Sequence, residues 1–325
     1  MFSAPRADFW RVGVVPTPIA KLAESSALSA LKHQIAWLPE SGPWQYIADP
    51  FGLQRADGIH VFVEAFDYRT KHAVIERHEL ASDLSWRGKT TVLARPFHLS
   101  YPFIIAHGGD TFMVPESHQA NEIALYRAHG SSGMGGTHGS LDHWVRETAL
   151  LADVPGAEPS LIQYQDRWWM FYTVVGPHAR DQRELHVAYA DALTGPWQRH
   201  ALNPVLTDRT GARPGGTPYL GDDGAVVLPV QDCSEAYGGA IRLLRFTELD
   251  ERRVVFEHTS ARLTGALVSD VYQAGFHTLS ACGNLSLIDV KKVTRSRAKH
   301  WLDLKRRSKR WATNLGLSKP TDRLG

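Results

Sequence analysis

Four short segments of this chain share one layout at nearly equal spacing, and each opens with a polar residue followed by proline. The four openings are Asp49-Pro50, Tyr101-Pro102, Glu158-Pro159 and Arg213-Pro214. They begin 52, 57 and 55 residues apart. In each segment a short strand-like run follows the proline, then a polar or glycine turn, then a second, mostly apolar strand. A period of about 50 residues built from β-hairpins is typical of a β-propeller, in which each repeat forms one blade.

The pattern predicts at least three strands in each of these four blades. The expected strands are Ile47–Leu53, Ile59–Ala65 and Ala73–Leu80 in the first blade; Pro102–Ala106, Thr111–Glu116 and Glu122–Ala128 in the second; Pro159–Tyr164, Trp168–Val174 and Glu184–Ala190 in the third; and Thr217–Leu220, Ala225–Val230 and Ala240–Phe246 in the fourth. Outer strands are expected after Trp86, from Trp197 and at Val254–His258. The glycine-rich loop at 129–140 has too many turn residues to belong to the core.

A fifth, weaker copy of the repeat lies at 275–292, with two strands and a turn but no opening proline. It lacks outer strands, which the strand-like pieces RVGVV and HQIAWLP of the N-terminal segment can supply, on either side of a helical piece around Ile19–Leu31. Closing a propeller in this way removes free strand edges. We therefore expect an all-β fold, a five-bladed β-propeller over residues 1–290, followed by a short C-terminal basic helix at 291–325.

Charge separates residues 291–325 from the rest of the chain. They carry 12 Lys and Arg against two acids, whereas the remainder has a net charge of −8. Within this segment a set of mostly apolar residues recurs at steps of three and four, which places them on one face of a helix. This set is Trp301, Leu304, Ser308, Trp311 and Leu315. Such a helix lies in an anionic membrane interface, docks on the propeller, or remains a solvated basic tail. Nucleic acid is not an expected partner.

Targeting and cofactor motifs are sparse. The N-terminus has no continuous apolar stretch of the kind found in secretory signals, and no apolar run approaches the length of about 18 residues that marks a membrane span. We therefore expect a cytoplasmic protein, peripheral at the inner membrane face if the basic helix binds lipid. No P-loop, H-E-x-x-H or dinucleotide-binding glycine motif in its proper setting is present. We expect no cofactor and no metal.

The polar residues at the blade openings are the main candidates for function. The innermost strands of a propeller line a central funnel, so residues that begin these strands converge from different blades. Two carboxylates across a cavity are the minimum for glycosidic chemistry, one acting as acid and the other as base or nucleophile. A funnel floor with little solvent raises a carboxyl pKa, as the acid requires. Asp49 and Glu158 are therefore expected to be catalytic.

Other polar residues are expected to bind the substrate. Arg213 can hold a carboxylate or phosphate through two hydrogen bonds, or can form an ion pair with Asp49 or Glu158. The expected substrate-binding residues are Tyr101, Glu116, Arg213, Asp67, Asp232 and His277. Glu64, His98 and His118 are further candidates for the same mouth. For each of these the structural alternative is a salt bridge, a turn cap or a satisfied core histidine.

The Asp-Pro and Glu-Pro openings resemble those of the five-bladed propeller glycosidases, the arabinanase/xylosidase and invertase/fructosidase groups. By that resemblance Asp49 takes the position of the base or nucleophile, and Glu158 that of the general acid. Those families open the second blade with a third carboxylate, where this chain has Tyr101. Glu116 is a candidate to replace the missing acid. Tyr101 is then expected to stack on or hydrogen-bond to the substrate, or to act as a nucleophile as in sialidases.

A closer resemblance covers nearly the whole propeller. It is carried by the strings WLPESGPWQYIADPFG, FVEAFDYR, PFHLSYPFI, VPESH, RWWMFYT, GARPGG, VQDCSEAYGGAIRL and FHTLS. These strings resemble those of bacterial proteins related to the N-terminal domain of plant glucosamine inositolphosphorylceramide transferase, in which a separate domain carries the glycosyltransferase fold. The resemblance implies a propeller that handles a glycan or glycolipid, often in surface-polysaccharide biosynthesis.

Two functions therefore stay open at this point. The first is a carbohydrate-active enzyme that cleaves or transfers a glycosidic bond of a glycan or of a sugar-containing lipid or nucleotide. The second is a non-catalytic glycan-binding or scaffolding propeller that partners a glycosyltransferase at the membrane. The paired carboxylates favour the first function, whereas Tyr101 in place of an acid and the basic tail favour the second.

Overall fold

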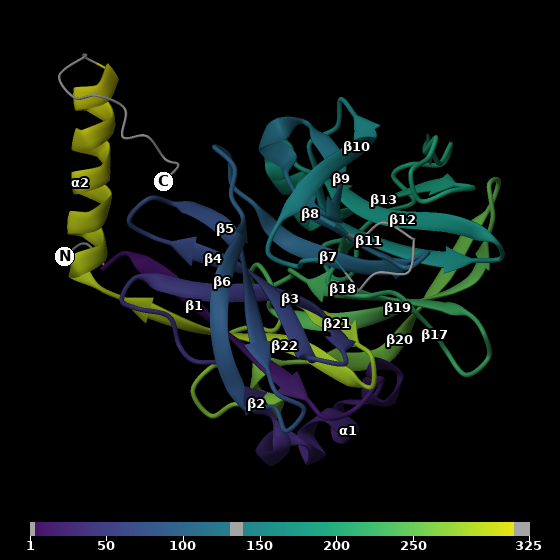
Figure 1. Ribbon diagram of the computed structural model, residues 1–325, viewed down its shortest axis with the longest axis horizontal. Helices are drawn as coiled ribbons and strands as arrows, with labels where there is room; N and C mark the ends of the chain where they lie inside the picture. Colours follow the sequence, from purple (N-terminus) through teal and green to yellow (C-terminus); the bar gives the residue numbers. More distant parts are fainter. Residues whose placement is uncertain (1–3, 131–138, 315–325) are drawn as a thin grey trace.

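The computed structural model describes residues 4–130 and 139–314 of the chain. It is a mainly-β, five-bladed propeller with a short C-terminal helix, so the predicted fold class is confirmed (Figure 1). Each blade is an antiparallel sheet whose strands follow one another in the chain, except in the blade that joins the two ends. Most of the glycine-rich loop at 129–140 lies outside the described residues.

The first four blades follow the repeats of the sequence. Blade one consists of β3 (Gln45–Arg55), β4 (Gly58–Asp67), β5 (His72–Leu80) and β6 (Trp86–Leu93). Blade two consists of β7 (Ser100–His107), β8 (Asp110–Glu116), β9 (Glu122–Ala128) and β10 (Trp144–Ala152). Blade three consists of β11 (Gly156–Tyr164), β12 (Arg167–Val174), β13 (Glu184–Ala190), β14 (Gln198–Arg199) and β15 (Leu206–Thr207). Blade four consists of β16 (Arg213–Pro214), β17 (Tyr219–Leu220), β18 (Val226–Asp232), β19 (Ala240–Leu249) and β20 (Val254–Leu263). Short 3₁₀ turns at His118–Ala120, Pro177–Gln182 and Gly265–Leu267 lie in connections.

Blade five joins the two ends of the propeller, as the sequence predicts. Its strand order is β2-β1-β22-β21. The strands are β1 (Arg6–Val15), β2 (Ala36–Trp37), β21 (Leu279–Cys282) and β22 (Leu285–Arg295). The whole length of β1 pairs with β22, from Arg6 opposite Arg295 to Val15 opposite Ser286. The strand β22 thus runs five residues beyond position 290, where the sequence places the end of the propeller.

The helical piece expected around Ile19–Leu31 is divided in the structure. It forms a 3₁₀ turn, η1 (Ile19–Leu22), a short helix α1 (Ser25–Ala30) and a second turn, η2 (Lys32–Gln34). These turns cover the end of the sheet of blade five, where Ile19, Leu22 and Leu28 are buried. The apolar residues of this segment are thus used to close one side of the core.

The core consists of apolar layers between the blades. Along each strand alternate side chains face opposite sides of the sheet, so a strand with two buried sides packs against both of its neighbouring blades. Phe171 and Phe246, for example, meet between blades three and four with ring centroids 4.9 Å apart. Trp144 and Trp168 are buried in such layers as well. These two tryptophans are therefore packing residues and not sugar-stacking residues.

The helix α2 (Arg297–Asn314) follows β22 after a single residue and projects away from the propeller (Figure 1). No helix in the described part of the chain has the length and apolar character needed to cross a bilayer. The side chains of Trp311 and Leu315, which the sequence places on the apolar face, lie outside the described residues.

Candidate active site

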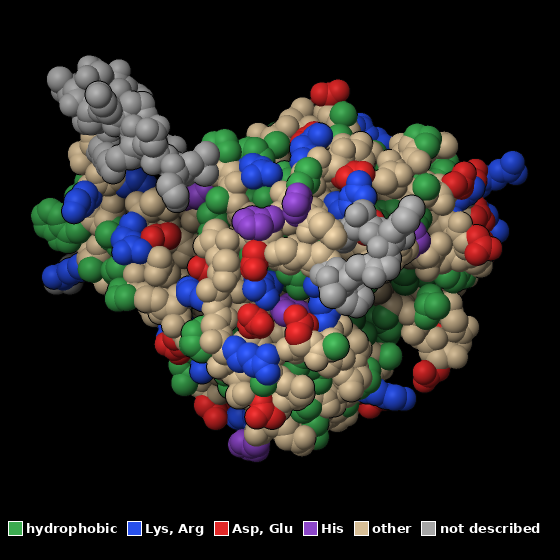
Figure 2. All heavy atoms as spheres, viewed as in Figure 1, with side chains coloured by type: hydrophobic (Ala, Val, Ile, Leu, Met, Phe, Trp, Pro, Cys, Tyr) green, Lys and Arg blue, Asp and Glu red, His purple; other side chains and the backbone are tan. Residues whose placement is uncertain are grey.

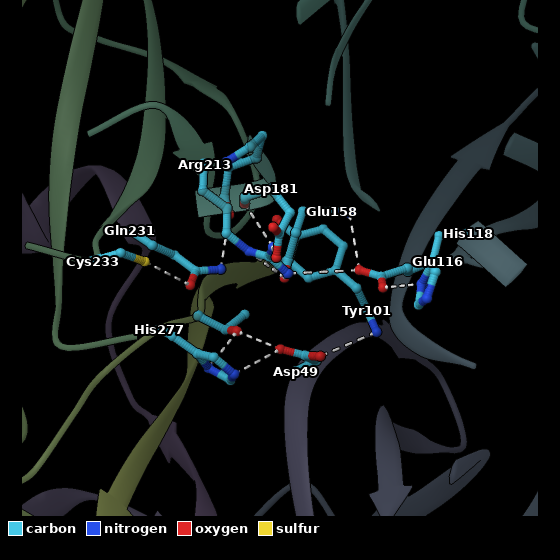
Figure 3. Close-up of polar contacts among 12 residues, drawn as sticks. Asp49, Tyr101, Glu116, His118, Glu158, Asp181, Arg213, Gln231, Cys233 and His277 are labelled. Carbon is cyan, nitrogen blue, oxygen red and sulfur yellow. Dashed lines mark hydrogen bonds and ion pairs between the residues drawn. The ribbon is translucent and has the colours of Figure 1, made fainter. Parts of the chain in front are cut away.

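The inner ends of the blades enclose a cavity of about 180 Å³ in the middle of the propeller (Figure 3). It is lined by Trp10, Tyr46, Asp49, Glu64, Phe66, His98, Ser100, Glu116, His118, Arg213, Tyr237 and His277. Pockets for drug-sized ligands measure roughly 300–1,000 Å³, so this cavity suits one small polar unit. A larger hollow of about 460 Å³ lies near the loops after β11 and β19, and its lining includes none of the candidate residues.

Three of the four opening residues share an unusual backbone conformation. The φ angles of Asp49, Tyr101 and Glu158 are 50°, 46° and 53°, in the left-handed region that side chains other than glycine rarely adopt. At each position the pairing of the inner strand with the next strand shifts register, as in a β-bulge. Bulges re-aim a side chain, and backbone strain of this kind clusters at functional sites. The repeated X-Pro sequence thus marks a repeated kink at the funnel floor.

Asp49 is buried at the floor of the cavity and is held on both carboxyl oxygens. The Thr278 hydroxyl donates to Oδ1 (3.0 Å), and the N–H of Tyr101 donates to Oδ2 (3.3 Å). The Nε2 of His277 lies 3.4 Å from Oδ1. Burial raises the pKa of Asp49 well above its ordinary value, and the negative charge of Glu158 raises it further. Asp49 therefore holds its proton to a higher pH than an exposed aspartate.

Asp289 on β22 supports this side of the floor. Its oxygens accept the backbone N–H groups of Asp49 (2.9 Å), His277 (3.2 Å) and Thr278 (2.9 Å), as well as Nδ1 of the His277 ring (2.8 Å). Donor atoms of Asp49, His277 and Asp289 lie within 4.8 Å of one another, a spacing that could suit a metal ion. Because the oxygens of Asp289 already accept these four hydrogen bonds, we assign it the role of positioning Asp49 and His277.

Glu158 is 1% exposed and lies beside Arg213 rather than on the cavity wall. The guanidinium donates to Glu158 Oε1 from Nε (3.1 Å) and from Nη2. The other oxygen, Oε2, is buried and has no hydrogen-bond partner among the described residues. Burial raises the pKa of Glu158 to about 7, with the charge of Glu116 adding to the shift and Arg213 opposing it. Of the two alternatives for Arg213, the structure thus shows the ion pair.

Glu116, the candidate to replace the acid that is missing at position 101, lines the cavity. Its Oε1 lies 2.8 Å from Nδ1 of His118, and its Oε2 accepts the backbone N–H of Glu158 (3.3 Å). Although burial alone would raise its pKa, the hydrogen bond to His118 and the charge of Arg213 together lower the pKa of Glu116. The cavity wall therefore combines an ionised glutamate with Asp49, whose pKa is raised, and Glu158, whose pKa is also raised, lies beside this wall. Glu64 also lines it, 3.3 Å from His98.

Tyr101 lies outside the cavity lining, so its contact with a substrate stays a prediction. Its side chain is fully buried beneath the floor, with the ring 4.6 Å from that of Phe51. The hydroxyl shares a hydrogen bond with Ser160 (2.8 Å) and accepts the N–H of Gly216 (2.5 Å). Burial of a large aromatic ring in an apolar layer is more favourable than its exposure in a polar cavity. The Tyr101 hydroxyl also bonds to partners on two other blades. The residue therefore links blades across the axis.

Asp67 and Asp232 are also absent from the cavity. Glu64 and Phe66 face the cavity from β4, so Asp67, which follows Phe66, points to the opposite side of the strand and pairs with Arg69 (2.6 Å). Asp232 lies at the end of β18 and pairs with Arg262 (3.1 Å). These two aspartates therefore form salt bridges rather than cavity wall, and substrate binding by them stays a prediction.

Aromatic rings supply the remaining wall of the cavity. Trp10 stacks on His277, with ring centroids 3.7 Å apart and an interplanar angle of 13°. Tyr46 stacks on Phe66 at 4.9 Å. Trp10, Tyr46 and Tyr237 were not predicted from the sequence, where the position of Tyr46 three residues before Asp49 is the signal that could have indicated it. A cavity with carboxylates and aromatic faces suits a sugar, because hydroxyls bond to carboxylates and ring C–H groups stack on aromatic faces.

Replacing Tyr101 by phenylalanine is expected to lower the free energy of unfolding by about 1–3 kcal/mol, because the buried N–H of Gly216 and the Ser160 hydroxyl lose their partner. Ligand binding in the cavity is expected to change less than about twofold. Urea denaturation and a binding titration on the same preparation measure both quantities. If Tyr101→Phe kept normal stability but lost ligand binding, Tyr101 would be assigned a direct contact with the substrate.

The pKa of Glu158 predicts how stability depends on pH. The pKa is raised from 4.5 to about 7 in the folded protein, so the folded state keeps a proton that the unfolded chain has lost. The free energy of unfolding should therefore fall as the pH rises from about 4.5 to about 7. Glu158→Gln cannot titrate and is expected to flatten this part of the curve, as measured by urea denaturation at several pH values. If the free energy of unfolding changed equally with pH in the wild type and in Glu158→Gln, this would contradict the assigned pKa of Glu158.

Comparison with known proteins gives one family. The sequence matches the family described as "Glucosamine inositolphosphorylceramide transferase 1, N-terminal" over residues 36–263. Glucosamine inositolphosphorylceramide transferase 1 of Oryza sativa subsp. indica is 32% identical over 211 residues, which are 64% of this chain and 27% of that protein. The Arabidopsis thaliana protein of the same name is 26% identical over 298 residues, 82% of this chain and 38% of that protein. The chain thus spans well under half the length of these relatives.

Solved structures with the same fold are glycosidases. An α-L-arabinofuranosidase from Podospora anserina, in complex with cellotriose, has a TM-score of 0.55 at 11% identity, covering 76% of this chain and 90% of that one. A β-xylosidase/α-arabinofuranosidase from a compost metagenome, in complex with xylotriose, has a TM-score of 0.51 at 10% identity, covering 77% and 91%. At such identities the likeness establishes the shared propeller fold.

Proposed function

The chain belongs to the family of the N-terminal domain of glucosamine inositolphosphorylceramide transferase 1, and from this we propose that its propeller is a carbohydrate-active enzyme. It would cleave or transfer a glycosidic bond in glycolipid or surface-polysaccharide biosynthesis. The observation that carries the proposal is the set of carboxyls at the funnel floor. Asp49 and Glu158 have raised pKa values, whereas the pKa of Glu116 is lowered.

A division of carboxyls into proton donors and acceptors is what glycosidic chemistry needs. Glu158, with a pKa of about 7, keeps a proton at neutral pH in part of the molecules and can give it to the leaving oxygen. Arg213 occupies its Oε1, so the acidic proton belongs on the unpartnered Oε2. For this transfer the ion pair with Arg213 must rearrange when a sugar enters, because Glu158 does not line the cavity.

Asp49 is assigned the role of base or nucleophile. Because its pKa is raised, this role needs the ionised form of Asp49, and that carboxylate is then a stronger acceptor for the proton of the attacking water or acceptor hydroxyl. Thr278 and the N–H of Tyr101 fix the orientation of this carboxylate. Glu116, ionised beside His118, supplies the negative charge that favours a positively charged sugar transition state.

A non-catalytic glycan-binding propeller that partners a glycosyltransferase is the second candidate. The bidentate contact of Arg213 with Glu158 favours it, because a carboxylate neutralised by a buried guanidinium is a poor proton donor. The curated relatives are named glucosamine inositolphosphorylceramide transferase 1, and this chain matches the family of their N-terminal part and covers 27% and 38% of the rice and Arabidopsis proteins. In this case the cavity would hold the glycan without cleaving it.

One set of measurements distinguishes the two candidates. The full chain is incubated with nitrophenyl glycosides of arabinose, xylose, glucose and glucosamine, with and without free inositol as acceptor, and products are identified by mass spectrometry. Binding of the corresponding free sugars is followed by saturation-transfer NMR, with Glu116→Gln as the cavity variant. Release or transfer supports the enzyme, and binding that Glu116→Gln weakens, without turnover, supports the second candidate. Neither binding nor turnover would contradict both.

A further inference from the structure

The helix α2 turns a polar face toward the propeller and an apolar, basic face away from it. Its half-buried residues are Lys299, Leu302, Asp303 and Arg306. Its exposed residues include Arg297, His300, Trp301, Leu304 and Lys305. We call this second group the outer face. Both sets recur at steps of three and four, so each occupies one side of the helix.

Contacts of the polar face fix the orientation of the helix. Arg306 Nη1 donates to the backbone carbonyl of Tyr68 (3.1 Å), and Lys299 Nζ lies 5.7 Å from the centre of the Tyr68 ring. Asp303 accepts hydrogen bonds from Lys299 (3.2 Å) and Arg306 (2.7 Å). The sequence left open whether the tryptophan-bearing face docks on the propeller. The helix does contact the propeller, but through its polar face.

The outer face exposes two large apolar side chains one turn apart. Trp301 is 73% exposed and Leu304 is 42% exposed. Trp86, by contrast, is 44% exposed, and its Nε1 donates to His78 on the propeller. Single exposed apolar residues are ordinary, but an exposed Trp-Leu pair on a projecting helix is a common feature of binding surfaces. Figure 1 shows that the helix extends beyond the edge of the propeller.

Positive charge surrounds this apolar pair. Arg297 and Lys305 lie one turn before and one turn after Trp301, and both are exposed. Residues 291–325 carry 12 Lys and Arg against two acids. Figure 2 shows Lys and Arg side chains beside hydrophobic ones at the edge of the molecule where α2 leaves the body. The occupant of such a surface has to be anionic and to accept apolar side chains.

We infer that the outer face of α2 docks the protein on an anionic lipid bilayer. Tryptophan favours the interfacial layer of a membrane, and leucine enters the acyl boundary next to it. Lys and Arg on the same face attract anionic headgroups. A helix held to the propeller by Tyr68 would place the whole domain at the membrane surface. This inference does not depend on the reaction proposed for the cavity.

The test is vesicle flotation of the full chain, with vesicles of pure phosphatidylcholine or of phosphatidylcholine with about 30% phosphatidylserine. The wild-type protein is expected to bind the anionic vesicles at least about tenfold more tightly, with the difference falling at high salt. Trp301→Ser and Lys305→Glu are each expected to weaken binding about fivefold or more. Trp86→Ser, which removes an exposed tryptophan from the propeller, is the matched control and should bind like the wild type.

Three outcomes would overturn the inference. The first is an absence of binding to anionic vesicles, which would assign the outer face to another partner. The second is equal binding of Trp301→Ser and wild type to anionic vesicles, which would mean that charge attraction alone accounts for membrane binding. The third is an equal loss of vesicle binding in Trp301→Ser and Trp86→Ser, which would mean that the effect is not specific to the outer face. Circular dichroism of each variant confirms that the fold is intact, and because both tryptophans are on the surface we expect normal folding.

Discussion

Replacing Glu158 by glutamine or Asp49 by asparagine is expected to lower turnover of any glycoside that the wild-type protein processes by roughly 10²–10⁴-fold, the usual contribution of a general acid or base. Glutamine cannot give the Oε2 proton to the leaving oxygen, and asparagine cannot accept one from the attacking group. Substrate affinity should change much less, because both replacements keep the shape of the side chain. Steady-state kinetics that separate kcat from KM measure the effect.

The pH dependence of the rate gives a second measure of the same roles. The basic limb of the kcat/KM profile, which reports the free protein, should fall near pH 7 in the wild type, because the pKa of Glu158 is about 7. This limb should disappear in Glu158→Gln. Asp67→Asn is the matched control, since Asp67 pairs with Arg69 away from the cavity and should keep normal activity. Full activity in both cavity variants would contradict the assigned site and favour the glycan-binding propeller.

Replacing Arg213 by alanine is expected to lower the free energy of unfolding by about 3–5 kcal/mol. Arg213 is 5% exposed and lies beside both Glu158 and Glu116, so its removal leaves Glu158 without its ion-pair partner and takes a positive charge from beside Glu116. Urea denaturation at about pH 8, where the carboxyls are most charged, should show the largest effect. At about pH 5 the loss should be smaller, because Glu158 can then be protonated.

A double-mutant cycle separates the ion pair from packing. Arg213→Met together with Glu158→Gln removes both charges and should regain part of the stability that Arg213→Met alone loses. Arg69→Ala is the surface control: Arg69 is 53% exposed on its side chain, so its ion pair should contribute little to stability. Additive losses in the cycle would show that the pair contributes packing and little electrostatic coupling.

The fold could be predicted because its signal repeats. One X-Pro opening says little, but four at equal spacing identify blades, and the incomplete fifth copy identifies the blade that the N-terminal strand completes. Blade geometry also predicted that the four opening residues converge on one cavity, and two of them, Asp49 and Arg213, line it. In each case the prediction depends on backbone topology, which the pattern of apolar residues and turns determines.

The orientation of individual side chains could not be predicted in the same way. Tyr101 has the backbone conformation of Asp49, yet its larger ring passes beneath the floor to the hydroxyl of Ser160 and the backbone of Gly216. Asp67 faces outward because it is one residue out of phase with Glu64 and Phe66. Both outcomes depend on register and on partners far away in the sequence. Trp10 was missed for the same reason, since blade five brings it to the cavity from the opposite end of the chain.

The pairing of β1 with β22 has a consequence for the order in which a ribosome could complete this molecule. β1 is synthesised first, but its partner is available only after Arg295 has left the exit tunnel. Until then Trp10 and His277, which stack on each other in the cavity wall, belong to an unfinished blade. Four blades can begin to pack during synthesis, whereas the carboxyl cluster stays open to water until the ring closes. A nascent chain would thus gain its ligand site in the last step of folding.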